Sequence, residues 1–261
     1  MRAIALGLTC NNACIFCAQG DLSAQHPGRP EVRLDEIRPN DVVAFVGGEP
    51  TLDDELAAFV RGAHARGARR IVVQTNGRRF AYRAYTRVMR EASDKLCLDV
   101  SLHGSTAAMH DYHTRTVGSF QQTAVGVRNA RGEGIDVGVT VVVTRSNYRH
   151  LVEIVQLAHG LGATAVKFVM AERIGRTVHA ADSIVPPIEL VQPHLTRATR
   201  EASRCGLGWV VGDRSSTPIV RDGFAGVGQV QQSVVGAVAR AEAARGPHVR
   251  LPVVAQFQGA V

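Results

Sequence analysis

Short apolar runs alternate with longer helical stretches along the 261-residue chain, and this alternation constrains the fold more than any other feature. The pattern recurs roughly every 25 to 40 residues, which is typical of strand–helix units that build a parallel sheet. Parallel strands need crossover connections, and helices of this length provide them. The predicted strands are 3–8, 42–46, 71–75, 96–102, 136–143 and 164–170, and the predicted helices are 53–66, 79–93, 119–132 and 149–161.

The predicted strands carry different residues on their two faces, because successive side chains of a strand point in opposite directions. In 96–103 the even positions are apolar, whereas the odd positions are Cys97, Asp99, Ser101 and His103. In 3–8 one face would consist of Ile4, Leu6 and Leu8. One apolar face under helices and one small or polar face favour a curved, barrel-like α/β sheet with a polar lumen.

Chemically distinctive residues follow five successive predicted strands. Ligands of parallel α/β folds bind at the carboxyl ends of the strands, so these residues are expected to meet in one site. The five stretches are CNNACIFC (10–17), GGEP (47–50), TNG (75–77), SLHG (101–104) and TRSN (144–147).

The first of these stretches holds three of the five cysteines, spaced Cys-x3-Cys-x2-Cys at Cys10, Cys14 and Cys17. A tight cluster within an odd number of cysteines is more typical of metal binding or catalysis than of a disulfide framework. A structural zinc site closes with four ligands, so zinc would need a distant fourth ligand such as His26, Cys97 or Cys205. An iron–sulfur cubane held by three thiolates would instead keep one iron open for a small molecule.

The cysteine spacing after the first strand, with Phe16 before the last cysteine, resembles the radical S-adenosylmethionine (SAM) enzyme superfamily. The GGEP stretch after the second strand is similar to the second hallmark of that family, and the three later stretches extend the resemblance over residues 1–175. The resemblance implies the core fold of the family, a partial (β/α)6 barrel. Residues 176–261 would then form a C-terminal extension that closes the barrel and shapes the substrate pocket.

The resemblance also implies cofactors and an activity. Cys10, Cys14 and Cys17 would bind one 4Fe–4S cluster, and SAM would chelate the fourth iron. One electron from the cluster would cleave SAM to methionine and a 5′-deoxyadenosyl radical, which would abstract hydrogen from a substrate. An electron donor such as flavodoxin or ferredoxin is the implied partner. The residues implied for SAM binding are Gly47, Gly48, Glu49, Pro50, Asn76, Ser101, His103, Thr144 and Asn147.

Several of these residues also have a structural interpretation. The two glycines of GGEP would permit a tight turn without any ligand, and Glu49 would either contact the methionine ammonium or hold its own loop. Asn76 is also a common turn former before Gly77, and Asn147 would alternatively cap the next helix. Zinc bound by the cysteines would make the chain a zinc-binding interaction module instead of an enzyme.

The sequence leaves the substrate open between two classes. One class is a ribosomal precursor peptide, and the other is a small metabolite that undergoes a dehydrogenation, an isomerisation or a carbon transfer. Because only Cys205 follows Cys97 among the cysteines, ligands for an auxiliary cluster are lacking. In the extension, 186–205 is predicted as a helix that Pro193 breaks or delays, 212–228 as a mobile lid and 229–246 as a further helix.

Composition bears on partners and location. The formal net charge of +7 would suit a nucleic acid, but the arginines are scattered and aromatic residues make up only 5%, so no nucleic-acid partner is expected. The longest apolar runs are too short to span a bilayer, and the start of the chain lacks the pattern of a signal peptide. Together with the clustered thiols, these features predict a soluble cytoplasmic protein without a membrane partner.

Overall fold

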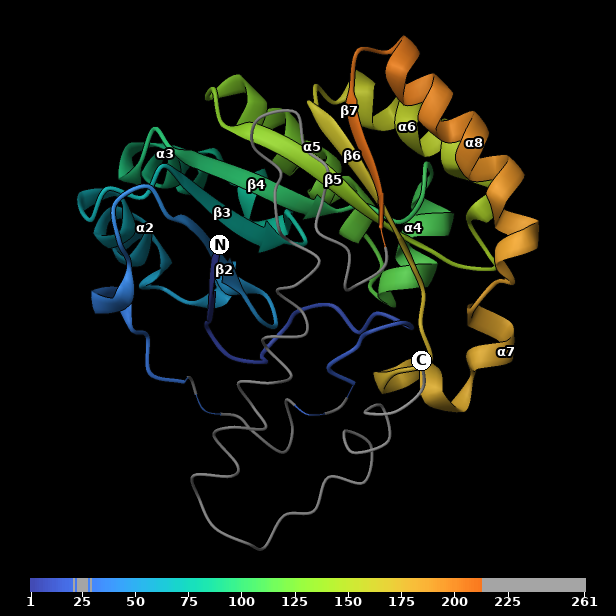
Figure 1. Cartoon of the computed structure of the whole chain (residues 1–261), viewed down its shortest axis with the longest axis horizontal. Coiled ribbons are helices and arrows are strands. Elements are labelled where there is room, and N and C mark those ends of the chain that lie inside the picture. The colour runs from blue at the N-terminus through green and yellow to red at the C-terminus, as the bar shows by residue number, and fades with distance from the viewer. Residues whose placement is uncertain (21, 23–27, 29, 213–261) are drawn as a thin grey trace, which may run out of the picture.

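The computed structural model describes the chain except residues 21, 23–27, 29 and 213–261. Its centre is one sheet of parallel strands in the order β1-β2-β3-β4-β5-β6-β7 (Figure 1). Strands that follow each other in the chain are thus neighbours in the sheet, as in a barrel built from strand–helix repeats. The strands are β1 (Arg2–Ala5), β2 (Val42–Val46), β3 (Arg70–Thr75), β4 (Leu96–Ser101), β5 (Asp136–Val143), β6 (Ala165–Met170) and β7 (Gly208–Gly212).

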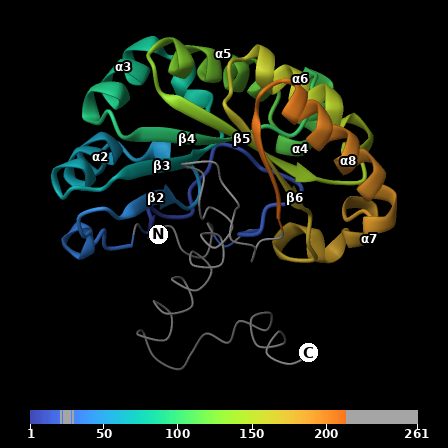
Figure 2. The same cartoon turned by 45° about the horizontal axis from the view of Figure 1, so that its top comes forward.

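Helices of the crossover connections cover the outer, convex side of the curved sheet (Figure 2). The α-helices are α2 (Leu56–Ala65), α3 (Arg83–Ala92), α4 (Ala107–Thr114), α5 (Ser119–Gly132), α6 (Leu151–Gly160), α7 (Ala181–Ile184) and α8 (Ile188–Arg204). Short 3-10 helices are η1 (Leu34–Glu36), η2 (Pro50–Leu52), η3 (Arg78–Ala81), η4 (Tyr148–His150) and η5 (Gly175–His179). Since β1 and β7 remain at opposite ends of the strand order, the barrel is open, and the predicted partial barrel is confirmed.

Two apolar layers follow from the alternation along the strands. Val137, Val139 and Val141 of β5 are at most 1% exposed and belong to the large core between the sheet and its helices. On the opposite face, a smaller cluster fills the lumen side of the first strands; it consists of Leu8, Val42, Ala44, Val46, Val72 and Cys97. The polar residues of the lumen therefore lie at the carboxyl end of β3 and on β4, β5 and β6.

The expected faces of the first strand are correct only up to its end. Ile4 and Leu6 lie in the main core, but Leu8 packs in the lumen cluster. The strand ends at Ala5, and Gly7 has a φ of 124°, which interrupts the alternation of an extended chain. The prediction that Leu8 shares a face with Ile4 and Leu6 is therefore wrong.

Residues beyond 180 form α7 and α8 and add the edge strand β7 to the sheet. The helix predicted at 186–205 is confirmed as α8, but Pro193 lies inside it and does not break it. Pro193 and Glu189 are both exposed, so water can bond to the carbonyl that loses its N–H partner. Val191, Ala198 and Ala202 of α8 are fully buried, and β7 pairs in parallel with β6. The predicted lid and the helix predicted at 229–246 lie outside the described residues, save Gly212.

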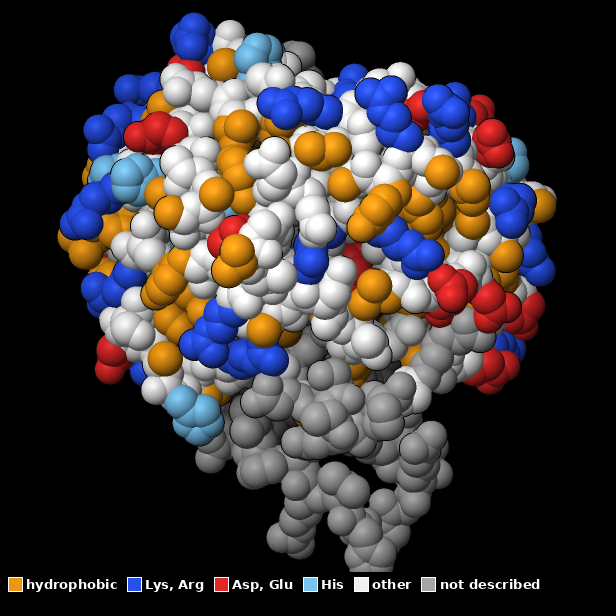
Figure 3. All heavy atoms as spheres, turned by 180° about the vertical axis from the view of Figure 1, so that it is seen from behind, with side chains coloured by type: hydrophobic (Ala, Val, Ile, Leu, Met, Phe, Trp, Pro, Cys, Tyr) orange, Lys and Arg blue, Asp and Glu red, His pale blue; other side chains and the backbone are white. Residues whose placement is uncertain are grey.

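No helix among the described residues is long and apolar enough to cross a membrane. Figure 3 shows one face of the molecule, on which lysine and arginine side chains are dispersed among acidic and neutral ones. This dispersal agrees with the scattered arginines of the sequence.

Candidate functional site

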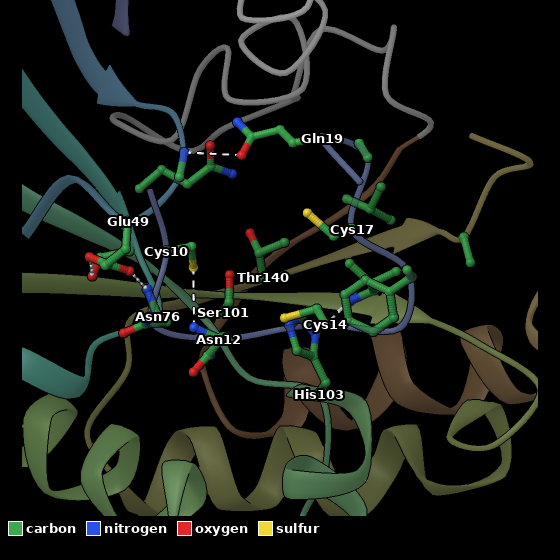
Figure 4. Close-up of a pocket in the computed structure, with 18 of the residues that line it drawn as sticks. Cys10, Asn12, Cys14, Cys17, Gln19, Glu49, Asn76, Ser101, His103 and Thr140 are labelled. Atoms are coloured by element: carbon green, nitrogen blue, oxygen red, sulfur yellow. Dashed lines mark hydrogen bonds between the residues drawn. The ribbon is translucent and has the colours of Figure 1, made fainter. Parts of the chain in front are cut away.

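A cavity of about 160 Å³ opens where the strands end at their carboxyl side (Figure 4). The loops after β1 and β2 form one wall, and the ends of β3, β4, β5 and β6 form the rest. Most residues predicted for the site line this cavity, although they come from distant parts of the chain. They are Cys10, Cys14, Cys17, Gly47, Gly48, Glu49, Asn76, Ser101 and His103.

The loop that carries the cysteines is held from two sides. Ala13 N–H donates to Thr114 O and Ile15 N–H donates to His113 O, both at 2.9 Å, so the end of α4 supports its middle. On the other side, the backbone N–H of Arg176 donates to Cys17 O at 3.0 Å. A Cβ on Gly175 would lie 2.2 Å from that same carbonyl oxygen, so only glycine allows this approach. The segment after β6 is therefore part of the cysteine site.

The three thiols face the cavity together in Figure 4. Burial raises the pKa of Cys10 to about 11, and the neighbouring charges of Glu49 and Cys17 add to that shift. Burial also raises the pKa of Cys14, and the charges of Cys17 and Cys10 contribute. Cys10 Sγ accepts a hydrogen bond of 3.4 Å from the backbone N–H of Asn12. At Cys10 and Cys14 the protein alone therefore favours the neutral thiol, and a bound cation would be needed to hold these two as thiolates.

This donor set fits a cluster better than a single ion. Among the described residues, no three His, Cys, Asp or Glu side chains lie close enough together to hold one metal ion. Each thiolate of an iron–sulfur cluster binds a different iron, so its ligands are spread more widely than those of zinc. Three soft thiol donors around one cavity match this requirement, and they supply one ligand fewer than a closed cubane needs.

The two glycines after β2 allow the loops after β1 and β2 to touch. A Cβ on Gly47 would lie 2.5 Å from Gly7 O, and one on Gly48 would lie 2.2 Å from Thr9 O. Their φ angles of 91° and 52° also favour glycine. The backbone N–H of Gly48 donates to Gln19 Oε1 at 3.1 Å. Gln19 also lines the cavity, and no sequence motif indicated it.

Glu49 is 3% exposed, and its carboxylate joins the loop after β2 to the end of β3. Oε1 accepts hydrogen bonds from Thr51 N–H at 3.1 Å, Thr51 Oγ1 at 2.7 Å and Thr75 Oγ1 at 2.6 Å. Oε2 accepts from the backbone N–H of Asn76 at 2.6 Å. Burial raises the pKa of Glu49, and these four hydrogen bonds oppose that shift. These hydrogen bonds are those of the role in which Glu49 holds its loop, and a contact with the methionine ammonium stays a prediction.

Asn76 connects β3 to the cysteine loop. Its Nδ2 donates to Asn11 Oδ1 at 2.7 Å, and its Oδ1 accepts from Arg78 N–H at 3.0 Å. Arg78 Nη1 donates to Asn11 O at 2.6 Å and to Asn12 Oδ1 at 2.8 Å. Both interpretations of Asn76 therefore have support, since it forms a turn and also lines the cavity beside Cys10.

His103 is buried, and its ring lies against Phe16 with centroids 4.6 Å apart in an edge-to-face contact. Its Nδ1 accepts a hydrogen bond of 3.2 Å from Val142 N–H, so the neutral ring carries its proton on Nε2. Burial, followed by the charges of His110 and His113, holds the pKa of His103 well below its usual value. His103 therefore offers a neutral Nε2–H donor in the cavity wall.

Pro50, Thr144 and Asn147 do not line the cavity. Pro50 is buried in η2. Asn147 Nδ2 donates to His103 O at 3.0 Å, and its Oδ1 accepts from Thr144 N–H at 2.8 Å. These residues lie outside the cavity, and Asn147 bonds to the backbone of His103, which lines it.

Two further lining residues, Thr140 and Lys167, were not singled out by a motif. The signal that could have found them is strand alternation. Thr140 pairs with Ser101 across β4 and β5 and with Lys167 across β5 and β6, so the three share one row on the lumen face.

Comparisons with known proteins agree with this geometry. The family model described as the Radical SAM superfamily matches residues 4–158. The AdoMet-dependent heme synthase of Oleidesulfovibrio alaskensis is 27% identical over 195 residues, which cover 70% of this chain and 49% of that protein. The mycofactocin maturase MftC of Mycobacterium tuberculosis is 32% identical over 167 residues, which cover 61% of this chain and 41% of that protein. The chain thus spans half the length of these relatives or less.

Solved structures share the fold. Streptococcus suis SuiB bound to precursor peptide SuiA matches with a TM-score of 0.61 over 80% of this chain and 48% of that chain, at 12% identity. A radical SAM methyltransferase from Sphaerobacter thermophilus matches with a TM-score of 0.58 over 82% of this chain and 66% of that chain, at 18% identity. Similarity at these identities concerns the fold alone. The shared fold is the partial barrel that the sequence predicts.

Proposed function

Since this chain belongs to the Radical SAM superfamily, we propose that it is an enzyme whose cavity binds one 4Fe–4S cluster and SAM, the cofactors of that family. The observation that carries the proposal is the meeting of three thiols, the glycine loop and His103 around one cavity. When bound, the cluster would supply one electron to the sulfonium of SAM, which would divide into methionine and a 5′-deoxyadenosyl radical that abstracts hydrogen from the substrate. All further roles belong to residues of this chain.

Cys10, Cys14 and Cys17 are the proposed cluster ligands, and their loop is fixed by α4 and by Arg176. Gly47 and Gly48 keep the loop after β2 against the loop after β1. Gly47 and Gly48 thereby line the cavity in which SAM would bind.

The remaining site residues are proposed to orient SAM. Ser101 and the Nε2–H of His103 would serve as hydrogen-bond donors to its polar groups. Glu49 and Asn76 would hold the loop that contacts the methionine end. Pro50, Thr144 and Asn147 would act indirectly through the segments that they support. The curved sheet would shield the radical from water.

A peptide is the substrate class that we propose. Its support is the relative at 32% identity, which is a maturase by name. A small metabolite is the second candidate, because the heme synthase relative matches a larger share of this chain, 70% against 61%. A flavodoxin or ferredoxin is proposed as the electron donor. The division into a core of 1–175 and an extension that shapes the substrate pocket stays a prediction, as does a cytoplasmic location.

Anaerobic reconstitution tests the cofactor assignment. The full chain should bind about four irons and four sulfides, and it should release 5′-deoxyadenosine from SAM when a chemical reductant is added. A colourless protein with one zinc would support an interaction module and overturn the proposal. Mass spectrometry of peptides encoded beside the gene, incubated with the reconstituted enzyme, separates the two substrate classes.

A further inference from the structure

One row of the sheet carries three polar side chains toward the lumen. Ser101 on β4 pairs with Thr140 on β5, and Thr140 pairs with Lys167 on β6. All three line the cavity. Asp99 lies two residues before Ser101 on β4 and therefore on the same face. In its row, Asp99 pairs with Gly138 on β5, and Gly138 pairs with Ala165 on β6. On its other side Asp99 pairs with Gln74 of β3, which also lines the cavity, so small residues adjoin Asp99 only on the side of β5 and β6.

Lys167 is the cation of this cavity. It is 8% exposed, and in the part of the chain that the structure describes no other lysine or arginine lines the cavity. Burial lowers the pKa of Lys167, and the charge of Asp99 opposes that shift. A buried ammonium is costly unless polar partners or an opposite charge stabilise it, so the surroundings of Lys167 decide what it can bind.

Asp99 lies behind Lys167 and is 1% exposed. Its Oδ1 accepts a hydrogen bond of 2.5 Å from Thr140 Oγ1. Its Oδ2 is buried, and among the described residues no partner bonds to it. Asp99 and Lys167 influence each other's pKa, yet within that same part of the chain no ion pair within 4.0 Å joins them. The ammonium is therefore balanced by a nearby charge but keeps N–H groups for a ligand in the cavity.

We propose that Lys167, positioned by Asp99 and Thr140, binds a carboxylate of the substrate, which makes the substrate a molecule with a free carboxylate. This inference rests on the proposed function and names the substrate class more narrowly. A carboxylate suits the site better than a phosphate, because the repulsion by the nearby Asp99 grows with the negative charge of the ligand. Glu49 does not compete for Lys167, since four hydrogen bonds within its own loops hold it.

The chain offers a direct test because it contains only two lysines, Lys95 and Lys167. Full-length protein grown on lysine that carries ¹³C at the ε carbon gives one signal for each, and Lys95→Met and Lys167→Met assign them. Cluster-loaded protein with bound SAM is titrated with sodium acetate, against sodium chloride at the same ionic strength and against neutral acetamide. We expect acetate, but neither chloride nor acetamide, to change the chemical shift of the Lys167 signal until the change saturates. The chemical shift of Lys95 should not change.

Two results would overturn the inference. The first is a Lys167 signal that no acetate concentration moves, with or without SAM. The second is an acetate response that is present without SAM and lost with it, because Lys167 would then serve the carboxylate of the cofactor. With a carboxylate-bearing peptide substrate, Lys167→Met should weaken binding about tenfold to hundredfold, and Lys95→Met should not change it. The proposed function fails separately, if wild-type protein assembles no cluster or cleaves no SAM.

Discussion

The carboxylate of Glu49 accepts a hydrogen bond of 2.6 Å from the backbone N–H of Asn76, which ties the loop after β2 to the loop after β3. Asn76 in turn donates to Asn11, next to Cys10. A buried carboxylate thus connects the methionine end of the proposed SAM site with the cysteine loop.

Glu49→Ala should therefore weaken SAM binding about tenfold to hundredfold while the iron content stays intact, because charge-assisted hydrogen bonds contribute about 1.5–3 kcal/mol. Calorimetry of SAM binding to cluster-loaded protein measures the first effect, and iron analysis measures the second. The exposed Glu91, changed to Ala, is the matched control. Unchanged affinity in Glu49→Ala would mean that the loops keep their geometry without this carboxylate.

Replacement of Cys10, Cys14 or Cys17 by Ala should abolish cluster assembly and SAM cleavage, since each thiol is assigned to a separate iron. Cys97 lies in the apolar lumen cluster and Cys205 lies at the end of α8, so their Ala variants should keep the cluster. Iron and sulfide content per chain, with the visible absorption of the cluster, distinguishes these cases. Full iron content in Cys14→Ala, or its loss in Cys205→Ala, would show that the ligand set is wrong.

Gly48→Ala should lower the free energy of unfolding by about 2–4 kcal/mol, because a Cβ at φ 52° would also meet Thr9 O at 2.2 Å. Gly134→Ala is the control for backbone strain alone, since Gly134 has a φ of 77° but no atom within 4 Å of an added Cβ. Denaturant titration of both variants separates the contact from the strain. Equal losses in the two would argue against a tight contact between the loops.

The sequence predicts the strands and the meeting of the cysteine and glycine loops well, because alternation and strand ends are local features. It does not predict the contact of Gly175 and Arg176 with Cys17, since two loops so far apart in sequence meet only in the folded sheet. Gln19 is missed for the same reason, because its partner is the backbone of Gly48. The position of Lys167 in the cavity wall could have been predicted, since its pairing with Thr140 follows from the predicted strands.

Truncation gives a test of where the folded core ends. A chain cut after residue 180 loses the buried face of α8 and the whole of β7, which leaves β6 as an exposed edge, so we expect it to aggregate. A chain cut after Gly212 should stay folded, keep its cluster and still cleave SAM. If 213–261 includes a lid, substrate modification should stop in this second variant. A monomeric, helical protein from the first cut would show that α8 and β7 are dispensable.

Three buried histidines predict a loss of stability in mild acid. Burial is the main cause that lowers the pKa values of His103, His110 and His113, and it lowers the pKa of His110 to about 4. The charge of Asp111 raises the pKa of His110, whereas those of His113 and Arg78 lower it. Below about pH 6.5 the unfolded chain therefore binds protons that the folded chain refuses, and stability falls as the pH falls.

For His110 alone the loss should reach about 2 kcal/mol at pH 5 and about 3 kcal/mol near pH 4, at 1.36 kcal/mol for each pH unit. Denaturant titrations of cluster-free protein at pH 7 and pH 5 measure it, so that acid decay of a cluster does not interfere. His110→Gln should remove the contribution of His110 to the difference in unfolding free energy between pH 7 and pH 5. The Oε1 of the new glutamine can still accept the hydrogen bond that His110 Nδ1 accepts from His103 N–H at 3.2 Å. A pH dependence in His110→Gln equal to that of the wild type would mean that His110 titrates in the folded chain much as it does in the unfolded one.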